Sequence, residues 1–335
     1  MKTGSTAIQT YLYKNFEELF SSRIMYPNLN GHGFGWQNSR GFSSGNAHVG
    51  EGETLGWHLE QTVPLFLDYD HVILSYEVLY LGAAKEKFWS ELDTFILKND
   101  VSVNVFGYLR DPFDYFISSY QQALKDLAYS ADLEDYVNDY PKTYFSFVYR
   151  EFLRIWTLAS SSLAELSFFR YEDAKSDIIE HFFKTACQIS GYSPLKSGSF
   201  PNKALGLIEQ EILKGINEVS PKVGRLFAFE LQDTLRSSEN REFNTELTYT
   251  LSDDAQEKLE VLFEEYRRQI SQVLPFAGRV DYSVTSPKLV DELSTLNLEI
   301  RHDLRNLGNI IGRFGSTGYL LWQIKQDLQK NQENS

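Results

Sequence analysis

Apolar residues recur along this chain in two alternating patterns, one with the period of a helix and one typical of buried strands. The first helical pattern ends near residue 20, and its expected inner face carries Ile8, Leu12, Phe16, Leu19 and Phe20. Short β-rich runs lie at residues 23–27, 71–76, 101–109 and 164–171. Because helical patterns separate these runs, we expect an α/β fold in which a parallel sheet is flanked by helices.

Longer helical patterns fill much of the remaining chain. They cover residues 58–68, 85–98, 113–127, 144–159, 174–189, 203–219 and 252–274. Residues 132–140 are polar and acidic, and we expect a connector there. Strand patterns stop before residue 193, so the C-terminal part is expected to be helical. We therefore divide the chain into an α/β domain at 1–280 and a helical extension with a tail at 281–335.

A regular apolar repeat lies near the C-terminus, in residues 286–311. Its members follow one another at spacings of three and four: Leu293, Leu296, Ile300, Leu304, Leu307 and Ile311. This spacing predicts a helix with one apolar face. That face either docks on the body of the protein or joins two copies of the chain in a homo-oligomer.

Between the first two expected strands, residues 28–57 are rich in Gly, Asn and Ser. Trp36, Phe42 and Trp57 interrupt this polar stretch. Loops of this length are usually functional or disordered, so the segment is either an ordered loop on the substrate side or a flexible insertion. The aromatic side chains favour the first alternative, because aromatic faces stack on sugars and on adenine rings.

The composition excludes several classes of protein. With 42% hydrophobic and 23% charged residues, the 335-residue chain has ample material for a globular core. It contains no run of about 18 apolar residues, so we expect no stable membrane insertion. A net charge of −14 argues against nucleic acid as a partner. The lone Cys187 suits a buried thiol in a reducing compartment, and we expect a cytoplasmic protein.

A candidate anion site lies at the start of the chain. Lys2 and Gly4 stand among three hydroxyl residues, Thr3, Ser5 and Thr6, directly before the first helical pattern. The first N–H groups of a helix have no partners within it, and the helix dipole adds positive charge there, so such a turn can bind an anion. The full phosphate-loop motif is absent, which makes this signal weak when taken alone.

Phosphate loops of this kind normally follow a buried strand that aims them. Only Met1 precedes Lys2, so the first strand of the expected sheet is missing from the sequence. Either that strand lies upstream of Met1, or the sheet lacks its central strand. The activity of the chain depends on which alternative holds, because the strand would anchor the loop.

Polar residues also stand where the other expected strands end. Glu77 follows the run at 71–76, Arg110 follows the run at 101–109, and Tyr171 ends the last strand. Ligands of parallel sheets bind outside the carboxyl ends of the strands. The strand ends and the turn at the start of the chain therefore converge on one expected site.

The residues after Arg110 form a good helix start. Asp111 suits the N-cap, and Pro112 suits the first helical position. Ser118 follows Arg110 by eight residues, which is about 2.2 helical turns. An Arg before a helix and a Ser two turns into it can approach the same anion.

Three motifs, taken in this order, resemble the sulfotransferases that use PAPS (3′-phosphoadenosine-5′-phosphosulfate). They are KTGST at residues 2–6, RDP followed by Ser118, and FRYED at residues 169–173. The resemblance covers roughly residues 2–275 and looks closest to bacterial sulfotransferase-like proteins. It implies a P-loop-like sulfotransferase fold, PAPS as the cofactor and no metal. The six histidines likewise show no spacing typical of metal ligands.

The resemblance also implies a role for each motif. Residues 2–6 would hold the 5′-phosphosulfate of the cofactor. Arg110 and Ser118 would hold the 3′-phosphate, and Tyr171 would lie near the adenine. These separate cationic and polar groups suit a cofactor that carries several negative charges.

Two residues would act in the transfer itself. Glu77 takes the position of the base that removes a proton from the acceptor, and Lys2 would neutralise the leaving phosphate. The acceptor would be a hydroxyl or an amine of a glycan or a small molecule. His58 and His71 are poorer candidates for the base, because His58 lies in a helical pattern and His71 begins its strand.

Two other functions are compatible with parts of the pattern. An anion loop followed by a helix also suits a small-molecule kinase that uses ATP and Mg²⁺, although its full motif and an acidic strand end are absent. A non-catalytic protein that binds glycans or partners on a sulfotransferase fold is the other alternative. Binding of different nucleotides would separate the three functions.

Overall fold

The computed structural model describes residues 4–28, 45–47, 55–75, 79–194, 207–228, 251–271, 273–274, 302–313 and 315. The chain divides into two compact units. The first unit comprises Met1–Tyr115, Pro141–Phe200 and Val261–Ala277, and the second comprises Phe116–Tyr140, Pro201–Glu260 and Gly278–Ser335. The expected boundary between residues 280 and 281 lies outside the described residues and stays a prediction.

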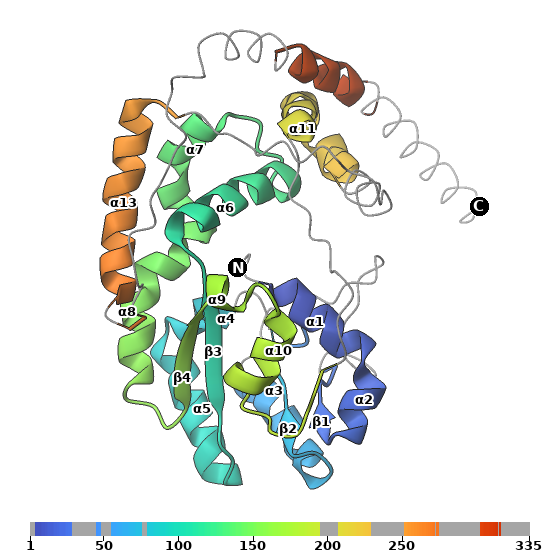
Figure 1. Ribbon diagram of the computed structural model, residues 1–335, viewed down its shortest axis with the longest axis vertical. Helices are drawn as coiled ribbons and strands as arrows, with labels where there is room; N and C mark the ends of the chain where they lie inside the picture. Colours follow the sequence, from blue (N-terminus) through green and yellow to red (C-terminus); the bar gives the residue numbers. More distant parts are fainter. Residues whose placement is uncertain are drawn as a thin grey trace, which may run out of the picture. The chain divides into compact units, whose positions relative to one another are not determined.

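The strands of the first unit form two parallel pairs (Figure 1). Strand β1 (Ile24–Met25) pairs with β2 (His71–Val72), and β3 (Asn104–Leu109) pairs with β4 (Glu165–Arg170). In the longer pair Asn104 lies opposite Glu165, and the register holds to the end of both strands. The predicted parallel pairing is thus confirmed, although the described strands form two small sheets instead of one.

Helices cover both faces of these strands (Figure 1). On one face α1 (Ser5–Lys14) and α10 (Ile178–His181) share a hydrophobic cluster with Ile73 of the β2 segment and Tyr108 of β3. On the other face the cluster is formed with α3 (Leu55–Thr62), α5 (Glu86–Asn99) and α8 (Phe147–Ala159). Adjacent strand residues point to opposite faces, so the unit is an α/β layer structure.

Short helical elements complete the described chain of this unit and its borders. They are α2 (Phe16–Ser21), η1 (Val63–Leu67), α4 (Leu79–Ala83), η2 (Tyr140–Lys142), η3 (Tyr144–Ser146), α9 (Tyr171–Ala174) and η4 (Phe182–Ala186). Two longer helices, α6 (Pro112–Asp126) and α13 (Asp253–Ser271), contribute residues to both units. No helix in the described part of the chain is long and apolar enough to cross a membrane.

The second unit is helical in its described residues. Besides parts of α6 and α13 it contains α7 (Leu133–Asp139), α11 (Leu207–Val219) and helices at 221–228 and 302–313. The helix at 302–313 docks on α11 through glycines: a Cβ built on Gly308 would lie 2.1 Å from the carbonyl oxygen of Ile212. This helix therefore docks through its glycines, whereas Leu307 of the expected apolar face is 46% exposed, and self-association stays a prediction.

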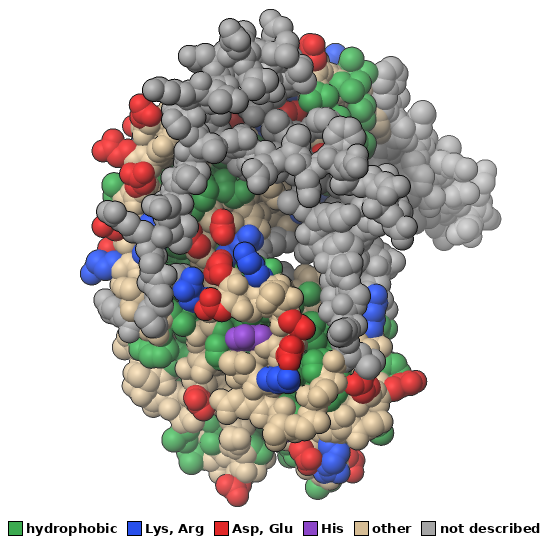
Figure 2. Space-filling model, in the orientation of Figure 1, with side chains coloured by type: hydrophobic (Ala, Val, Ile, Leu, Met, Phe, Trp, Pro, Cys, Tyr) green, Lys and Arg blue, Asp and Glu red, His purple; other side chains and the backbone are tan. Residues whose placement is uncertain are grey.

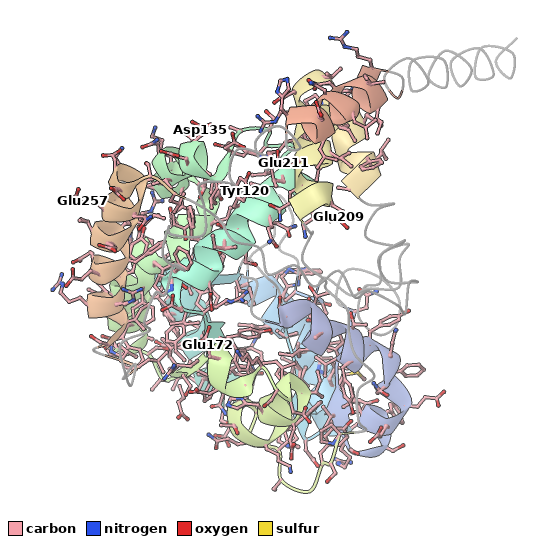
Figure 3. All side chains as sticks on the ribbon, turned by 45° about the horizontal axis from the view of Figure 1, so that its top comes forward. Tyr120, Asp135, Glu172, Glu209, Glu211 and Glu257 are labelled. Carbon is pink, nitrogen blue, oxygen red and sulfur yellow. The ribbon has the colours of Figure 1, made fainter. Side chains whose placement is uncertain are left out.

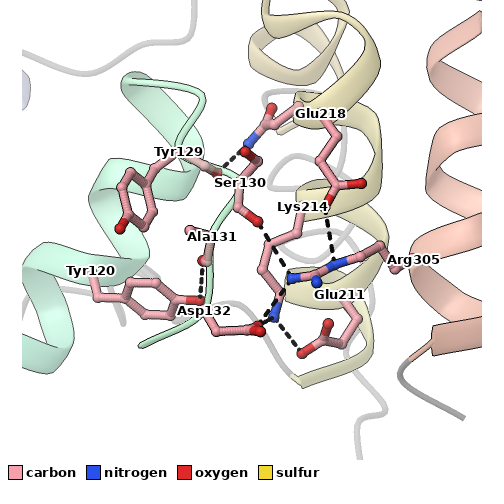
Figure 4. A network of polar contacts seen from close by, with 10 residues as sticks. Tyr120, Tyr129, Ser130, Ala131, Asp132, Glu211, Lys214, Glu218 and Arg305 are labelled. Atoms are coloured by element: carbon pink, nitrogen blue, oxygen red, sulfur yellow. Dashed lines mark hydrogen bonds and ion pairs between the residues drawn. The ribbon is translucent and has the colours of Figure 1, made fainter. Parts of the chain in front are cut away.

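Charged side chains join the same helices of the second unit (Figure 4). Lys214 of α11 lies 2.5 Å from Asp132 and 2.7 Å from Glu211. Arg305 lies 3.0 Å from Asp132 and 3.3 Å from Glu218. We call these five residues the Lys214 network.

The expected connector at 132–140 is wrong, because most of it is helix α7. Leu133, Tyr136 and Val137 are buried at helical spacing, and Glu134 and Asp135 lie in the first turn, where acidic side chains complement the helix dipole. The acidic residues that suggested a connector therefore stabilise the start of a helix.

Two expected helices are shorter than predicted. The helix near the start of the chain breaks at Asn15, whose side-chain amide donates to the carbonyl oxygen of Tyr11. Phe16 and Phe20 consequently leave the expected inner face and are 38% and 53% exposed. The helix expected at 174–189 is reduced to α10 and the π-helical turn η4.

Candidate functional site

Gly4 begins helix α1 and lies against the end of strand β4. It is the N-cap of α1 with φ of 78°, a left-handed conformation that disfavours any side chain. A Cβ at this position would lie 3.0 Å from Ile178 and 3.4 Å from the ring of Tyr171. Backbone conformation and close packing therefore both require glycine here, as expected for a turn that exposes the N–H groups of a helix start.

Arg110 also lies next to this tyrosine. Its guanidinium carbon is 5.4 Å from the centre of the Tyr171 ring, within the range of a cation–π contact. Its Nε is buried without a hydrogen-bond partner, and its guanidinium forms no ion pair with the residues that the structure describes. The structure thus brings together three residues that the sequence predicted for the site: Gly4, Arg110 and Tyr171.

The turn that carries Arg110 is held from several sides. The hydroxyl of Tyr149 donates to the carbonyl oxygen of Arg110 at 2.5 Å, and the amide of Asp111 donates to Oε1 of Glu172 at 3.2 Å. Burial raises the pKa of Tyr149 well above its usual value, so this hydroxyl remains a donor. The backbone of Arg110 is therefore fixed, while no carboxylate among the described residues pairs with its guanidinium.

Asp111 caps helix α6 as predicted. Its Oδ1 accepts a hydrogen bond from the amide of Phe113 at 2.9 Å, and Pro112 is the first residue of the helix. Its Oδ2 lies 3.7 Å from Nε of Arg267 on α13. We refer to Gly4, Arg110, Asp111, Tyr171 and Glu172 together as the Arg110 site.

Charges of both signs meet at this site. Figure 2 shows basic and acidic side chains next to one another over α9 and the ends of β3 and β4, with no large patch of one sign. Figure 3 shows Glu172 at the start of α9, where these two strands end. Oε2 of Glu172 is buried without a hydrogen-bond partner. The Arg110 site therefore presents an unpaired donor and an unpaired acceptor.

Of five further predicted site residues, the structure describes two. Ser5 and Thr6 are the first residues of α1 and are half-buried. Lys2, Thr3 and Glu77 lie outside the described residues, and their roles stay predictions.

Ser118 lies in the second turn of α6 and is half-buried. It belongs to the second unit, whereas Arg110 belongs to the first. Its role in binding a phosphate stays a prediction.

The segment that leads to Glu77 is tied to α1 by residues that sequence reasoning missed. Nε2 of Gln9 donates to Oγ of Ser75 at 2.8 Å, and the amide of Ser75 donates to Oδ1 of Asn46 at 2.7 Å. Nδ2 of Asn46 also donates to the carbonyl oxygens of Pro27 and Ile73, both at 2.8 Å. Asn46 thus takes the place of a strand partner beyond β1 and β2, which explains why these strands are short.

Different signals could have revealed these two side chains. Gln9 is fully buried in the inner face of an amphipathic helix, so a polar residue inside an apolar pattern was the available sign. Asn46 stands among Gly and Ser in the long loop at 28–57, and the sequence contains nothing that distinguishes it from its neighbours.

A tyrosine–histidine pair lies next to the site. The hydroxyl of Tyr108 and Nδ1 of His181 are 3.0 Å apart, and burial lowers the pKa of His181. The imidazole is therefore neutral at neutral pH. Cys187 is a free, half-buried cysteine, and burial raises the pKa of its thiol to about 12, so it remains protonated.

Among the described residues, no group of three or more His, Cys, Asp or Glu side chains is placed to hold a metal ion. Comparison with protein-family models, with curated proteins and with solved structures found no match.

Proposed function

We propose that this protein transfers a sulfuryl group from PAPS to a hydroxyl or an amine of a glycan or a small molecule. The unpaired guanidinium of Arg110, fixed beside the start of α1, is the observation that carries the proposal. Buried cationic groups without a partner are rare in folded proteins, because each one loses its hydration without compensation. Arg110 as a whole is only half-buried, so an anion can approach its guanidinium and supply the counter-charge that no described residue provides.

Two features of the first unit support the proposed P-loop-like sulfotransferase fold. Its described strands are parallel and have helices on both faces, and a helix start lies at the carboxyl ends of the strands. Such ends are where α/β proteins bind nucleotides.

Different residues of the chain would bind the cofactor and act in the transfer. The amides at the start of α1 would bind the 5′ end of the cofactor, and Arg110 would bind its 3′-phosphate. Lys2 would neutralise the charge that develops on the leaving phosphate. Glu77 would accept the proton of the acceptor group. PAPS supplies the sulfuryl group when it is bound.

A binding experiment tests this proposal. Adenosine 3′,5′-bisphosphate, the expected product, should raise the unfolding temperature of the full chain, because a ligand that binds only the folded state stabilises it. Arg110→Ala should weaken this binding on the order of tenfold to a hundredfold, as expected for lost hydrogen bonds between charged groups. Isothermal titration calorimetry measures both affinities.

Arg154→Ala is the matched control, because Arg154 lies on the outer surface of the same unit with its side chain 61% exposed. It should leave the affinity unchanged. Stabilisation by ATP with Mg²⁺, but not by the bisphosphate, would favour the kinase instead. No effect of either nucleotide would favour a non-catalytic binding protein.

A further inference from the structure

The C-terminal half of α13 packs against the turn that carries Arg110. Aromatic rings make this contact. The ring centre of Phe263 lies 6.3 Å from that of Phe113 at the start of α6, and Tyr266 stacks on Tyr149 with ring centres 5.1 Å apart and planes 17° apart. Tyr149 in turn donates its hydroxyl to the carbonyl oxygen of Arg110. This part of α13 therefore supports the backbone of the Arg110 site.

Arg267 adds a positive charge to this support. Its Nε lies 3.7 Å from Oδ2 of Asp111, whose side chain is only 8% exposed. The other carboxylate oxygen of Asp111, Oδ1, accepts a hydrogen bond from the amide of Phe113. Both oxygens of this carboxylate are therefore directed to groups other than the guanidinium of Arg110.

Asp111 is the carboxylate that would otherwise compete for Arg110. The two residues are consecutive in the chain, and their charges act on the same hydroxyl, that of Tyr149, with opposite effects on its pKa. Guanidinium and carboxylate groups pair strongly when they meet. The guanidinium of Arg110 lies instead over the ring of Tyr171. The ion pair with Arg267 explains why Asp111 leaves it there.

We propose that Arg267 is a positioning residue, which holds Asp111 away from Arg110 and so keeps Arg110 available for the 3′-phosphate of the nucleotide. This inference rests on the proposed function, in which Arg110 binds that phosphate. Arg267 acts through Asp111 and does not contact the ligand. Its charge also offsets the negative charge of Asp111, which would repel an anionic ligand.

The experiment measures the preference for the 3′-phosphate by isothermal titration calorimetry on the full chain. It compares adenosine 3′,5′-bisphosphate with adenosine 5′-monophosphate, which lacks only that phosphate. The native protein should bind the bisphosphate about tenfold or more tightly, as expected for charge-assisted hydrogen bonds. In Arg267→Met this ratio should fall by about fivefold or more, because Asp111 then competes with the phosphate. A general loss of stability would weaken the binding of both compounds and leave the ratio unchanged.

Three further variants serve as controls. Arg267→Lys keeps a cation beside Asp111 and should hold the ratio within about threefold of the native value, because this contact uses a single nitrogen and not the two-pronged fork of arginine. Arg268→Met changes the next residue of α13, which forms an exposed pair with Glu265, and should leave the ratio unchanged. If Arg267→Met does not fold, Arg267→Gln replaces it. The glutamine keeps a donor for Asp111 without the charge and should still lower the ratio.

A double substitution separates positioning from direct binding. Arg110→Ala removes the group on which Arg267 is proposed to act. Adding Arg267→Met to it should therefore weaken the binding of the bisphosphate by less than about twofold further, since residues that act through one another are not additive. An additive loss would show that Arg267 binds the ligand itself, and it would overturn the inference.

The remaining outcomes distinguish the inference from the proposed function. An unchanged ratio in a folded Arg267→Met or Arg267→Gln variant would make the positioning role wrong, and the proposed function would still stand. Equal binding of the two compounds by the native protein would remove the proposed role of Arg110 and that of Arg267 with it. If the native protein binds neither compound, the proposed function is overturned, and the positioning role fails as well.

Discussion

The two units hold their inner arginine and lysine side chains in opposite ways. In the second unit Lys214 is 4% exposed and contacts the carboxylates of Asp132 and Glu211, and Arg305 contacts Asp132 as well as Glu218 (Figure 4). In the first unit the guanidinium of Arg110 has an aromatic ring on one side and no carboxylate partner among the described residues. The Lys214 network and the Arg110 site both place cations in partly dehydrated surroundings. Carboxylates neutralise these cations only in the Lys214 network.

This difference separates structural charges from functional ones. A buried ion pair that satisfies itself needs nothing from outside, and it fixes the helices that carry it. A buried cation that remains unpaired retains affinity for an anion, and perturbed or unsatisfied groups concentrate at functional sites. The Lys214 network is therefore expected to determine stability, and the Arg110 site to determine ligand binding.

Lys214→Met should have the largest effect on stability. It leaves Glu211, whose side chain is 5% exposed, without its only described partner. Breaking a buried pair in this way costs about 3–5 kcal/mol of unfolding free energy. Urea unfolding followed by circular dichroism measures the loss.

Two controls accompany that variant. The double substitution Lys214→Met with Glu211→Leu removes both charges and should recover most of the loss, because an apolar pair of similar volume replaces the ion pair well. Lys258→Ala breaks an exposed pair on α13 and should change little. Equal losses in the single and double variants would show that Lys214 stabilises through packing and not through charge.

Gly308→Ala should have the next largest effect, because it tests the helix contact on which the Lys214 network depends. The added methyl group would meet the carbonyl oxygen of Ile212, so the two helices must separate. Overpacking of this kind costs about 1–3 kcal/mol. Asn306→Ala, at an exposed position of the same helix, is the control for helix propensity. Unfolding midpoints of the two variants should differ by several degrees.

Acid should lower the free energy of unfolding through Asp132 of the Lys214 network, and this loss should be smaller than that caused by Gly308→Ala. Burial alone would raise the pKa of Asp132, but the hydrogen bond and charge of Lys214, together with Arg305, hold it below the usual value of 3.8. A lowered pKa stabilises the fold above the unfolded value, and this stability is lost as the pH falls through the folded pKa. The loss is therefore expected below about pH 4.

Asp132→Asn tests that assignment. The variant should be less stable than the native protein at pH 6, and its stability should fall less steeply between about pH 4 and pH 2, the range in which carboxylates of this kind titrate. Denaturant midpoints at each pH provide the comparison. Parallel profiles for the two proteins would mean that other carboxylates control the acid sensitivity.

The fold was predictable where the sequence pattern is local. Alternating strands and helices gave the parallel pairing of β3 with β4, and Asp111 with Pro112 gave the start of α6. The early end of β2 was not predictable, because it depends on Asn46, which is distant in the sequence and lies in a loop without pattern. Helix α7 was not predictable from its composition, because its acidic first turn has the same residues as an exposed connector.

The candidate site was predictable in its parts and not in its contacts. Motifs at strand ends identified Gly4, Arg110 and Tyr171 separately. Their meeting depends on the tertiary fold, which brings both Gly4 and the guanidinium of Arg110 close to the ring of Tyr171. The unpaired oxygen of Glu172 could not be foreseen either, since pairing with a neighbouring arginine is the ordinary outcome for a carboxylate.

Arg110→Met should have the smallest effect on the stability of the protein without ligand. The variant loses a cation–π contact worth about 0.5–1 kcal/mol, but it also removes a buried Nε that has no partner. These changes oppose each other, so the unfolding free energy should remain within about 1 kcal/mol of the native value. Urea unfolding without nucleotide measures this. A loss as large as that of Lys214→Met would make Arg110 a structural residue, and the contrast between the two clusters would no longer indicate where the ligand binds.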